Sequence, residues 1–258
     1  MKIFEQKRPQ KPAFEYTDKI KGVCMTFDLS KEKKGYISGG SCDEIWKHCV
    51  KKWKELSLYD IARENKPLRL YLDLEFKRKE NPDIKDESDH VNLACKFIEE
   101  ELIKYYNITL DSPKRWKIFT SSDKEIASYH SILLCDDVFR FKDTASLQTF
   151  MMLAKQDFEN TSSEDFQRLC VIKNGKKGCF IDFSVYTRNR QFRTAFSTKK
   201  GQNRYFLPYD RDKKTVKMER NIQDWKNSLV SFSSSESPIL LENLGTQKRK
   251  RKLVPLSQ

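Results

Sequence analysis

Two carboxylates stand two positions apart inside an otherwise apolar segment. Asp73 and Glu75 lie within residues 68–76, which are rich in leucine and aromatic side chains and are bounded by Pro67 and a charged run that begins at Lys77. Such a segment is typical of a buried strand, and side chains two apart on a strand point to the same face. Because neighbouring buried anions repel each other and lose hydration, they need a cation. We therefore expect a divalent-metal site; the alternative is an edge strand with a wet polar face.

A third carboxylate, Asp182, lies in the apolar segment 179–183. One aspartate in a strand is commonly a turn or edge residue, but this one could complete a three-carboxylate cluster with Asp73 and Glu75. Clusters of this kind hold two divalent ions, which activate an attacking hydroxyl and neutralise phosphates during phosphoryl or nucleotidyl transfer. The three acids together point to metal-dependent chemistry on phosphates.

Two further segments carry groups that bind phosphate. Ser128 and His130 share a face of an expected strand, and an imidazole beside a hydroxyl can hydrogen-bond phosphate oxygens; a solvated strand start is an equal alternative. The stretch YTRNRQFR (186–193) follows Asp182 closely and interleaves three arginines with aromatic residues. Guanidinium groups match phosphate geometry, and aromatic rings give bases a platform. A generic basic hairpin is the alternative for this stretch.

Together these segments resemble a known superfamily. LYLDLEF (70–76), SYH (128–130) and IDFSVYTRNRQFR (181–193) occur in the order of motifs I, II and III of the archaeo-eukaryotic primases, and they look most like the eukaryotic primase–polymerases. The resemblance covers roughly residues 20–210. It implies an α+β fold with a primase-type catalytic core, in which an α/β module and an RRM-like module carry mixed sheets.

The resemblance also implies a role for each motif residue. Asp73, Glu75 and Asp182 would be catalytic residues that bind two Mn²⁺ or Mg²⁺ ions. Ser128 and His130 match the pair that contacts the phosphates of the incoming nucleotide. Further nucleotide-binding positions are Arg190, Gln191, Arg193, Lys199 and Tyr59.

The activity implied is that of a DNA-directed primase and polymerase. Nucleotides would be transferred to a DNA or RNA primer on a template, with release of pyrophosphate, in replication restart or damage tolerance. The implied partners are single-stranded DNA template and primer, nucleoside triphosphates and a single-stranded-DNA-binding protein, and we expect a monomer.

Two departures from the family pattern keep alternatives open. Ile126 stands where the family often has a lysine, and Lys124 lies two residues further upstream. The C-terminal part of the chain has no Cys/His cluster like that of the family's zinc-binding module, so we expect no structural zinc. One alternative is therefore a homologue that only extends primers or only binds nucleic acid. A metal-dependent nuclease is another, and it would not need the arginine-rich segment.

Composition supports a nucleic-acid partner. The 258 residues carry 50 Lys and Arg against 37 Asp and Glu, a formal net charge of +13. Such an excess of positive charge favours a polyanionic partner, and nucleic acid is a better candidate than an anionic membrane. The alternative is that the excess of lysine only keeps the protein soluble. No run approaches the roughly 18 apolar residues of a membrane span, and the N-terminus lacks an apolar signal core. The seven scattered cysteines indicate reduced thiols.

The elements that must position these groups are a mixture of helices and strands, which indicates an α+β fold. The expected strands are 23–27, 36–37, 68–76, 116–120, 130–135 and 179–183. The expected helices are 42–56, 91–106, 144–159 and 221–230, with caps at Ser41, Asp143 and Asn221.

We expect three parts in the chain. Residues 1–20 would be a basic, extended arm, residues 21–230 a catalytic core of two interleaved modules, and residues 231–258 a flexible tail. The basic run from Lys248 to Lys252 predicts a nuclear localisation signal or, alternatively, a tail that grips DNA. The family also permits residence in mitochondria.

Overall fold

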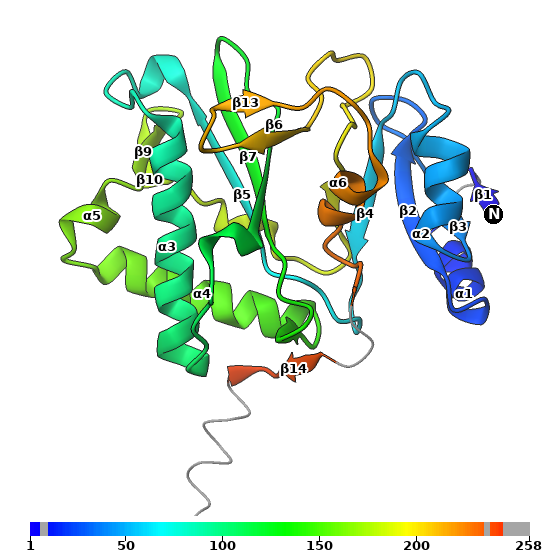
Figure 1. The fold of residues 1–258 in the computed structure, drawn as a ribbon, viewed down its shortest axis with the longest axis horizontal. Coiled ribbons are helices and arrows are strands. Elements are labelled where there is room, and N and C mark those ends of the chain that lie inside the picture. Colours follow the sequence, from blue (N-terminus) through cyan, green and yellow to red (C-terminus); the bar gives the residue numbers. More distant parts are fainter. Residues whose placement is uncertain (6–9, 235–237, 245–258) are drawn as a thin grey trace, which may run out of the picture.

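The chain folds into two five-stranded sheets that stand side by side (Figure 1). The computed structural model describes residues 1–5, 10–234 and 238–244. The first sheet has the order β1-β3-β2-β4-β11 and is antiparallel. Its strands are β1 (Lys2–Phe4), β3 (Lys34–Gly39), β2 (Val23–Asp28), β4 (Leu58–Ala62) and β11 (Arg190–Arg193). The second sheet, β13-β12-β6-β7-β5, is antiparallel too. Its strands are β13 (Thr215–Val216), β12 (Leu207–Asp210), β6 (Trp116–Thr120), β7 (Ile126–Leu133) and β5 (Tyr71–Lys77).

The chain crosses between the two sheets more than once. It builds the first sheet up to β4, continues into β5, β6 and β7 of the second sheet, and returns to the first sheet as β11. It then enters the second sheet again as β12 and β13. The last strand of the first sheet is therefore supplied by residues that follow most of the second sheet.

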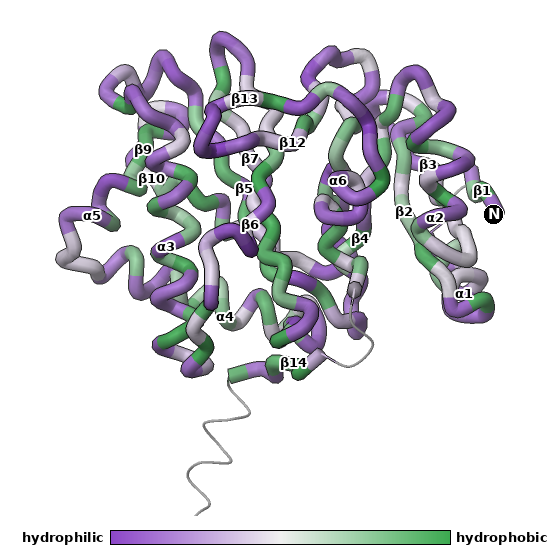
Figure 2. The backbone as a smooth tube through the Cα atoms, in the orientation of Figure 1, coloured by the Kyte–Doolittle hydropathy of each residue, from purple (hydrophilic) through white to green (hydrophobic). Residues whose placement is uncertain are grey.

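Two long helices cover the flank of the second sheet that lies away from the first (Figure 1). They are α3 (Glu87–Tyr106), which packs on β7, and α4 (Thr144–Asn160), which packs on α3. Hydrophobic residues follow the strands and the inward sides of these helices, and hydrophilic residues occupy the connecting loops (Figure 2). The smaller helices are α1 (Gln10–Lys19), α2 (Cys42–Ile45), α5 (Glu164–Gln167) and α6 (Ile222–Asn227).

Two short strand pairs lie outside the main sheets. The hairpin of β9 (Cys170–Lys173) and β10 (Lys176–Cys179) precedes Asp182, and β8 (Phe139–Phe141) pairs with β14 (Ile239–Leu241) in parallel. A π-helical turn, η1, spans Trp46–Val50, and 3₁₀ helices span Arg78–Glu80 (η2), Pro113–Arg115 (η3) and Phe183–Val185 (η4).

The α+β class and most of the expected elements are confirmed. The caps at Ser41, Asp143 and Asn221 accept hydrogen bonds from backbone N–H groups at the helix starts. The strand expected at 116–120 is β6 with the same ends, and the helix expected at 144–159 is α4. All seven cysteines are free thiols, as expected. Among the described helices, none is long and apolar enough to cross a membrane.

Three expectations about local structure are wrong. The first twenty residues are not an extended arm, because β1 pairs with β3 and α1 buries Ala13 and Thr17 against the first sheet. The helix expected at 42–56 ends in the π-helical turn at Val50. The tail is partly ordered, because β14 adds to β8 and buries Leu241. The run from Lys248 to Lys252 lies outside the described residues.

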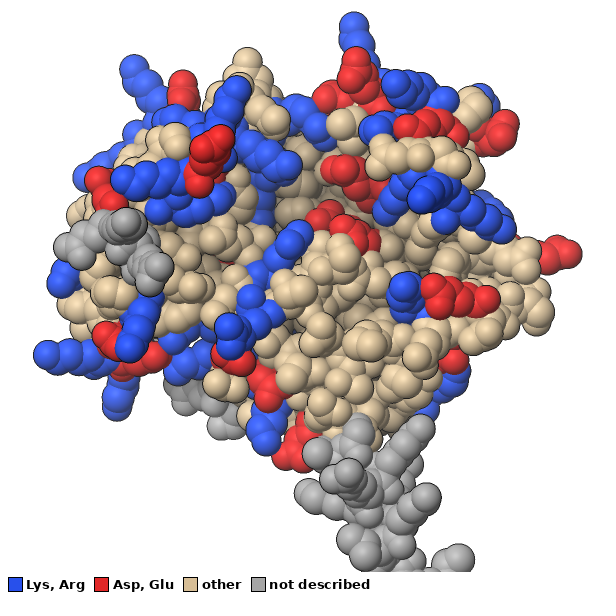
Figure 3. Space-filling model, turned by 180° about the vertical axis from the view of Figure 1, so that it is seen from behind, with Lys and Arg blue, Asp and Glu red and all other residues tan. Residues whose placement is uncertain are grey.

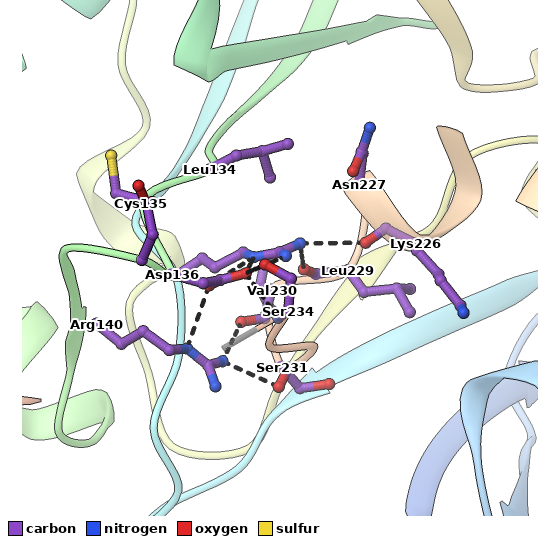
Figure 4. A network of polar contacts seen from close by, with 12 residues as sticks. Leu134, Cys135, Asp136, Arg140, Lys226, Asn227, Leu229, Val230, Ser231 and Ser234 are labelled. Carbon is purple, nitrogen blue, oxygen red and sulfur yellow. Dashed lines mark hydrogen bonds and ion pairs between the residues drawn. The ribbon is translucent and has the colours of Figure 1, made fainter. Parts of the chain in front are cut away.

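A buried polar network joins the start of β5 to the segment after α6 (Figure 4). Arg69 forms a buried ion pair with Asp136, and the two side chains are 3% and 2% exposed. Ser234 donates to the same carboxylate from its N–H and its hydroxyl at 3.0 and 2.9 Å. Arg140, also buried, donates to the carbonyl of Ser231 at 2.9 Å. This network fixes the chain immediately before the strand that carries Asp73.

Candidate active site

The strand β5 presents Asp73 and Glu75 on one face, as the spacing predicted. In the antiparallel ladder with β7, Asp73 lies opposite His130 and Glu75 lies opposite Ser128. Leu72, Leu74 and Phe76 are all buried on the other face. Because directly opposite residues of a ladder share a face, the four polar residues of motifs I and II form one patch on the sheet.

Asp182 joins this patch from the other edge of β5. Ile181 forms an isolated bridge with Leu74, and the N–H of Asp182 donates to the carbonyl of Asp73 at 2.8 Å. The sequence predicted a strand through this segment, but β10 ends at Cys179 and Asp182 caps the short 3₁₀ helix Phe183–Val185. Its Oδ1 accepts hydrogen bonds from the N–H and hydroxyl of Ser184 at 2.9 and 2.6 Å.

The three acids repel one another. The pKa of Asp73 is raised to about 7, mainly by burial and then by the charges of Asp182 and Glu75. Arg190 and Arg193 act in the opposite sense on the same carboxyl group. The cluster therefore holds more negative charge than its surroundings neutralise, which is the condition that a bound cation relieves.

The donor set suits Mg²⁺ or Mn²⁺, since both ions prefer carboxylate oxygens. Among the described residues, however, no three His, Cys, Asp or Glu side chains converge closely enough to hold an ion as they stand. The case for a metal site therefore rests on the chemistry of three adjacent carboxylates and on the raised pKa of Asp73.

His130 is held in a fixed orientation by two aromatic rings. Its imidazole stacks on Phe192 of β11 and on Phe206, with ring centroids 3.8 and 3.7 Å apart. Its Nε2 lies 3.9 Å from Oδ1 of Asp73. Burial, and then the charge of Arg193, hold the pKa of His130 well below its usual range. The ring is therefore neutral near pH 7, with one nitrogen able to donate a hydrogen bond and the other able to accept one.

Ser128 is buried beside Glu75 and is supported by the loop that precedes β7. Its N–H donates to the hydroxyl of Ser122 at 2.9 Å, and its own hydroxyl accepts from the hydroxyl of Ser121 at 3.4 Å. Ser128 and His130 share one face while Tyr129 points away, as expected. The hydroxyl of Tyr129 donates to Glu87 at the start of α3 instead.

The arginine-rich segment supplies the facing wall. Asn189 adopts a left-handed conformation with φ 55° and leads into β11, whose Arg190 is exposed. The guanidinium of Arg193 lies 4.5 Å from the ring of Phe206, and its buried Nε has no hydrogen-bond partner among the described residues. Gln191 lies opposite Ile61 in the ladder with β4 and interacts with Tyr36 on the α1 side of the sheet. The structure thus separates Gln191 from the acids.

Tyr59 lies opposite Arg193 in the first sheet and belongs to a second polar group. Its hydroxyl donates to Asp28 at 2.8 Å, and the ammonium of Lys34 lies 3.5 Å from its ring centroid. Burial lowers the pKa of Lys34, and the charges of Arg193 and Lys199 act in the same direction. Lys34, Arg193 and Lys199 are therefore close enough to repel one another, and we call them the basic cluster.

The cluster of acids and the basic cluster meet between the two sheets. Seen from behind, the molecule is hollowed between its two halves, and both acidic and basic side chains line the hollow (Figure 3). His130 connects the two sheets, because it lies on β7 of the second sheet and stacks on Phe192, which belongs to β11 of the first sheet. The arrangement can hold a cation against the acids and an anion against the basic cluster.

Sequence reasoning missed Phe206, Lys34 and Asp28 as parts of this region. Phe192 stands within the arginine-rich motif, so the motif itself could have identified it. Lys34 and Asp28 are ordinary polar residues between the strands predicted at 23–27 and 36–37, and Phe206 lies in a stretch with no pattern. Asp28 and Lys34 lie opposite each other in the ladder of β2 and β3, and Phe206 comes to lie against His130 from the segment between β11 and β12.

Comparison with known proteins supports a distant relationship. No protein-family model matches the chain. It is similar to proteins named DNA-directed primase/polymerase protein: that of Danio rerio is 26% identical over 77% of this chain and 43% of the relative. The protein of Homo sapiens is 25% identical over 62% and 39%, and that of Gallus gallus is 23% identical over 83% and 48%.

The chain thus spans less than half the length of these relatives. The relationship to primase–polymerases that the three motifs predicted is confirmed by these similarities, and the mixed helices and antiparallel sheets are compatible with a primase-type core.

Proposed function

We propose that this relative of the DNA-directed primase/polymerase proteins is a template-directed nucleotidyltransferase. It transfers nucleotides to a DNA or RNA primer with release of pyrophosphate. The observation that carries the proposal is the patch on the second sheet, where Asp73, Glu75 and Asp182 adjoin His130 and Ser128 and face Arg193. A nuclease would need the acids but not the cations opposite them.

Asp73, Glu75 and Asp182 would hold two Mg²⁺ or Mn²⁺ ions. Bound there, the ions would activate the primer hydroxyl and neutralise charge on the reacting phosphates. Arg190, Arg193 and Lys199 would offset the charge of the triphosphate. The Nε of Arg193, which has no hydrogen-bond partner among the described residues, would donate to a phosphate oxygen.

The neutral His130 orients the nucleotide instead of attracting it by charge. With its ring fixed between Phe192 and Phe206 and hydrogen-bonded to the backbone of Arg193, the imidazole holds its other nitrogen at a defined position, where it can accept a hydrogen bond from the nucleotide. Ser128 adds a hydroxyl on the same face. Tyr59 and Gln191 remain proposed nucleotide contacts, and in this structure their partners are Asp28 and Tyr36.

The template and primer are proposed to be single-stranded DNA and a paired oligonucleotide, held by the excess positive charge. Binding should therefore weaken as salt rises. Action as a monomer, contact with a single-stranded-DNA-binding protein, a role in restart or damage tolerance, and a nuclear or mitochondrial location are proposals that rest on the resemblance alone.

A template-directed incorporation assay tests the function. The purified chain is run with and without a primer, in Mg²⁺ and in Mn²⁺, beside the variant Asp73→Ala/Glu75→Ala. The control variant, Glu32→Ala/Glu219→Ala, removes two exposed carboxylates that are not among the three acids. We expect metal-dependent incorporation that only the first variant loses.

Four other results would each change the assignment. Incorporation by Asp73→Ala/Glu75→Ala would overturn the assignment of the acids. Degradation of the primer without incorporation would identify a nuclease, and DNA retention without any reaction would identify a binding module. Incorporation only when a primer is supplied would restrict the activity to extension.

A further inference from the structure

A second concentration of positive charge lies outside the candidate active site. A cavity of about 390 Å³ opens between the turn after α1, the end of β4 and the strand β8. Its lining includes the cations Lys21, Arg63, Lys66 and Arg140, and Asp18 is its one carboxylate. None of the residues proposed above to bind metal or nucleotide lines it.

Arg140 forms the buried end of this cavity. It is 5% exposed, and its Nη2 donates to the carbonyls of Pro67, Val230 and Ser231 at 3.0, 3.3 and 2.9 Å. Its Nε has no hydrogen-bond partner among the described residues and lies 3.7 Å from Asp136. One terminal nitrogen of Arg140 carries no contact in Figure 4 and points away from the network.

The charge of Arg140 is therefore only partly compensated. The nearest carboxylate, Asp136, already accepts from Arg69. Burial lowers the pKa of Arg140 to about 10, and the charge of Asp136, which acts in the opposite direction, does not cancel this effect. A buried guanidinium beside a cavity is costly unless an anion or water occupies the space.

The other cations around the cavity are also in excess. Arg63 donates to both oxygens of Asp18 at 3.0 and 2.8 Å, and Lys66 reaches the same carboxylate at 3.2 Å. Within the described part of the chain, the side chain of Lys21 has no ion-pair partner. One carboxylate thus faces several cations, so the cavity favours an anion.

We propose that this cavity binds a phosphate group, carried either by a nucleotide or by the backbone of a nucleic-acid strand. A guanidinium fork backed by ammonium groups is suited to the tetrahedral oxygens of phosphate. The volume lies in the lower range of small-ligand sites, roughly 300–1,000 Å³, and leaves room for a group attached to the phosphate. The site is independent of the proposed polymerase activity.

The test follows the Nε–H signal of Arg140 by NMR, assigned through its loss in Arg140→Lys. Inorganic phosphate is titrated at constant ionic strength into the wild type and into Lys21→Gln/Lys66→Gln. The matched control is Lys11→Gln/Lys19→Gln, which removes two exposed cations of α1 that do not line the cavity. We expect a saturable shift whose affinity falls about tenfold in the cavity variant and changes less than about twofold in the control.

Three further arms locate the ligand and its source. Arg193→Ala should leave the shift intact, because Arg193 belongs to the other site. Deoxyadenosine monophosphate and a single-stranded oligonucleotide without terminal phosphates are then compared, and the one that shifts the signal at lower concentration identifies the source. The proposal is overturned if none of the three ligands gives a saturable shift, if both double variants weaken binding equally, or if Arg193→Ala abolishes it.

Discussion

Replacing Arg69 by methionine should destabilise the protein more than any exposed charge substitution. Nε of Arg69 donates to both oxygens of Asp136 at 3.1 Å, and Nη1 donates to the carbonyls of Lys226 and Leu229 at 3.1 and 3.0 Å. Methionine fills much of the same volume but removes all of these donors. Asp136 then keeps its charge in a site where it is 2% exposed.

The magnitude follows from what remains around Asp136. Removing one partner of a buried ion pair costs about 3–5 kcal/mol. Ser234 still donates twice to the carboxylate and Arg140 lies 3.7 Å away, which favours the lower end. The carbonyl of Lys226 still accepts from the N–H of Leu229 at 3.2 Å, whereas the carbonyl of Leu229 loses its donor, which adds about 1 kcal/mol. We expect a loss of about 4–5 kcal/mol in the free energy of unfolding.

Urea unfolding at pH 7 measures this loss, with Arg69→Met, Asp136→Leu and the double variant compared in a cycle. The double variant should recover about 2 kcal/mol or more of the summed cost, because it leaves no unpaired charge from this pair. Arg188→Met, at an exposed arginine that pairs with Glu64 at 3.5 Å, is the control and should cost less than about 1 kcal/mol. A loss below about 1 kcal/mol for Arg69→Met, or additivity in the cycle, would refute the reasoning.

Three other outcomes follow from the structure. Burial and the neighbouring Asp157 raise the pKa of Glu101 to about 8; the folded state therefore holds a proton that the unfolded state has released between about pH 4.5 and 8. Stability should fall as pH rises through that window, by up to about 1.4 kcal/mol per unit, and urea unfolding of Glu101→Gln should show a weaker dependence. The pKa of Asp73 is also raised, to about 7, so the ionised carboxylate likewise destabilises the folded state at high pH. In the absence of metal, Asp73→Asn should therefore be more stable than the wild type by about 1–2 kcal/mol at pH 8. Thermal unfolding should show that this gain in stability shrinks below pH 5. An equal gain at pH 8 and below pH 5 would contradict the repulsion between the acids. Phe206→Ala opens the stack on His130 to water, so an NMR titration should find the pKa of the imidazole closer to its usual value near 6.5; an unchanged titration would show that the stack does not desolvate the ring.

The parts of the fold that sequence predicted well have a strong local pattern. The helix α4 keeps its apolar spacing from Leu147 to Ala154, and its cap at Asp143 marks the start. β5 and β6 are short apolar runs between polar segments. That Asp73 and Glu75 share a face could be predicted because side chains alternate along a strand, whereas the position of Asp182 beside β5 comes from a bridge between distant residues.

The parts that were missed depend on distant residues. β11 is four residues long and begins and ends with arginine, so nothing local marks it as a strand; its pairing with β4 decides its conformation. The N-terminal residues are polar, but α1 needs only a few small side chains to pack against β2 and β3. Arg69 lies inside an apolar run, and its partner Asp136 stands 67 positions away. Local patterns carry no information about such a pair.

The segment that links Asp182 to Arg190 has a consequence for how the site can open. Tyr186 donates to the carbonyl of Tyr71 at 2.7 Å, and Tyr71 donates to the carbonyl of Val185 at 3.3 Å. The ring of Tyr71 also packs on Phe192. These contacts attach the short link to β5 itself, so the acids and the arginines belong to one cooperative unit. A local opening that frees β11 exposes the carboxylate strand as well, and both halves of the site are lost or restored together.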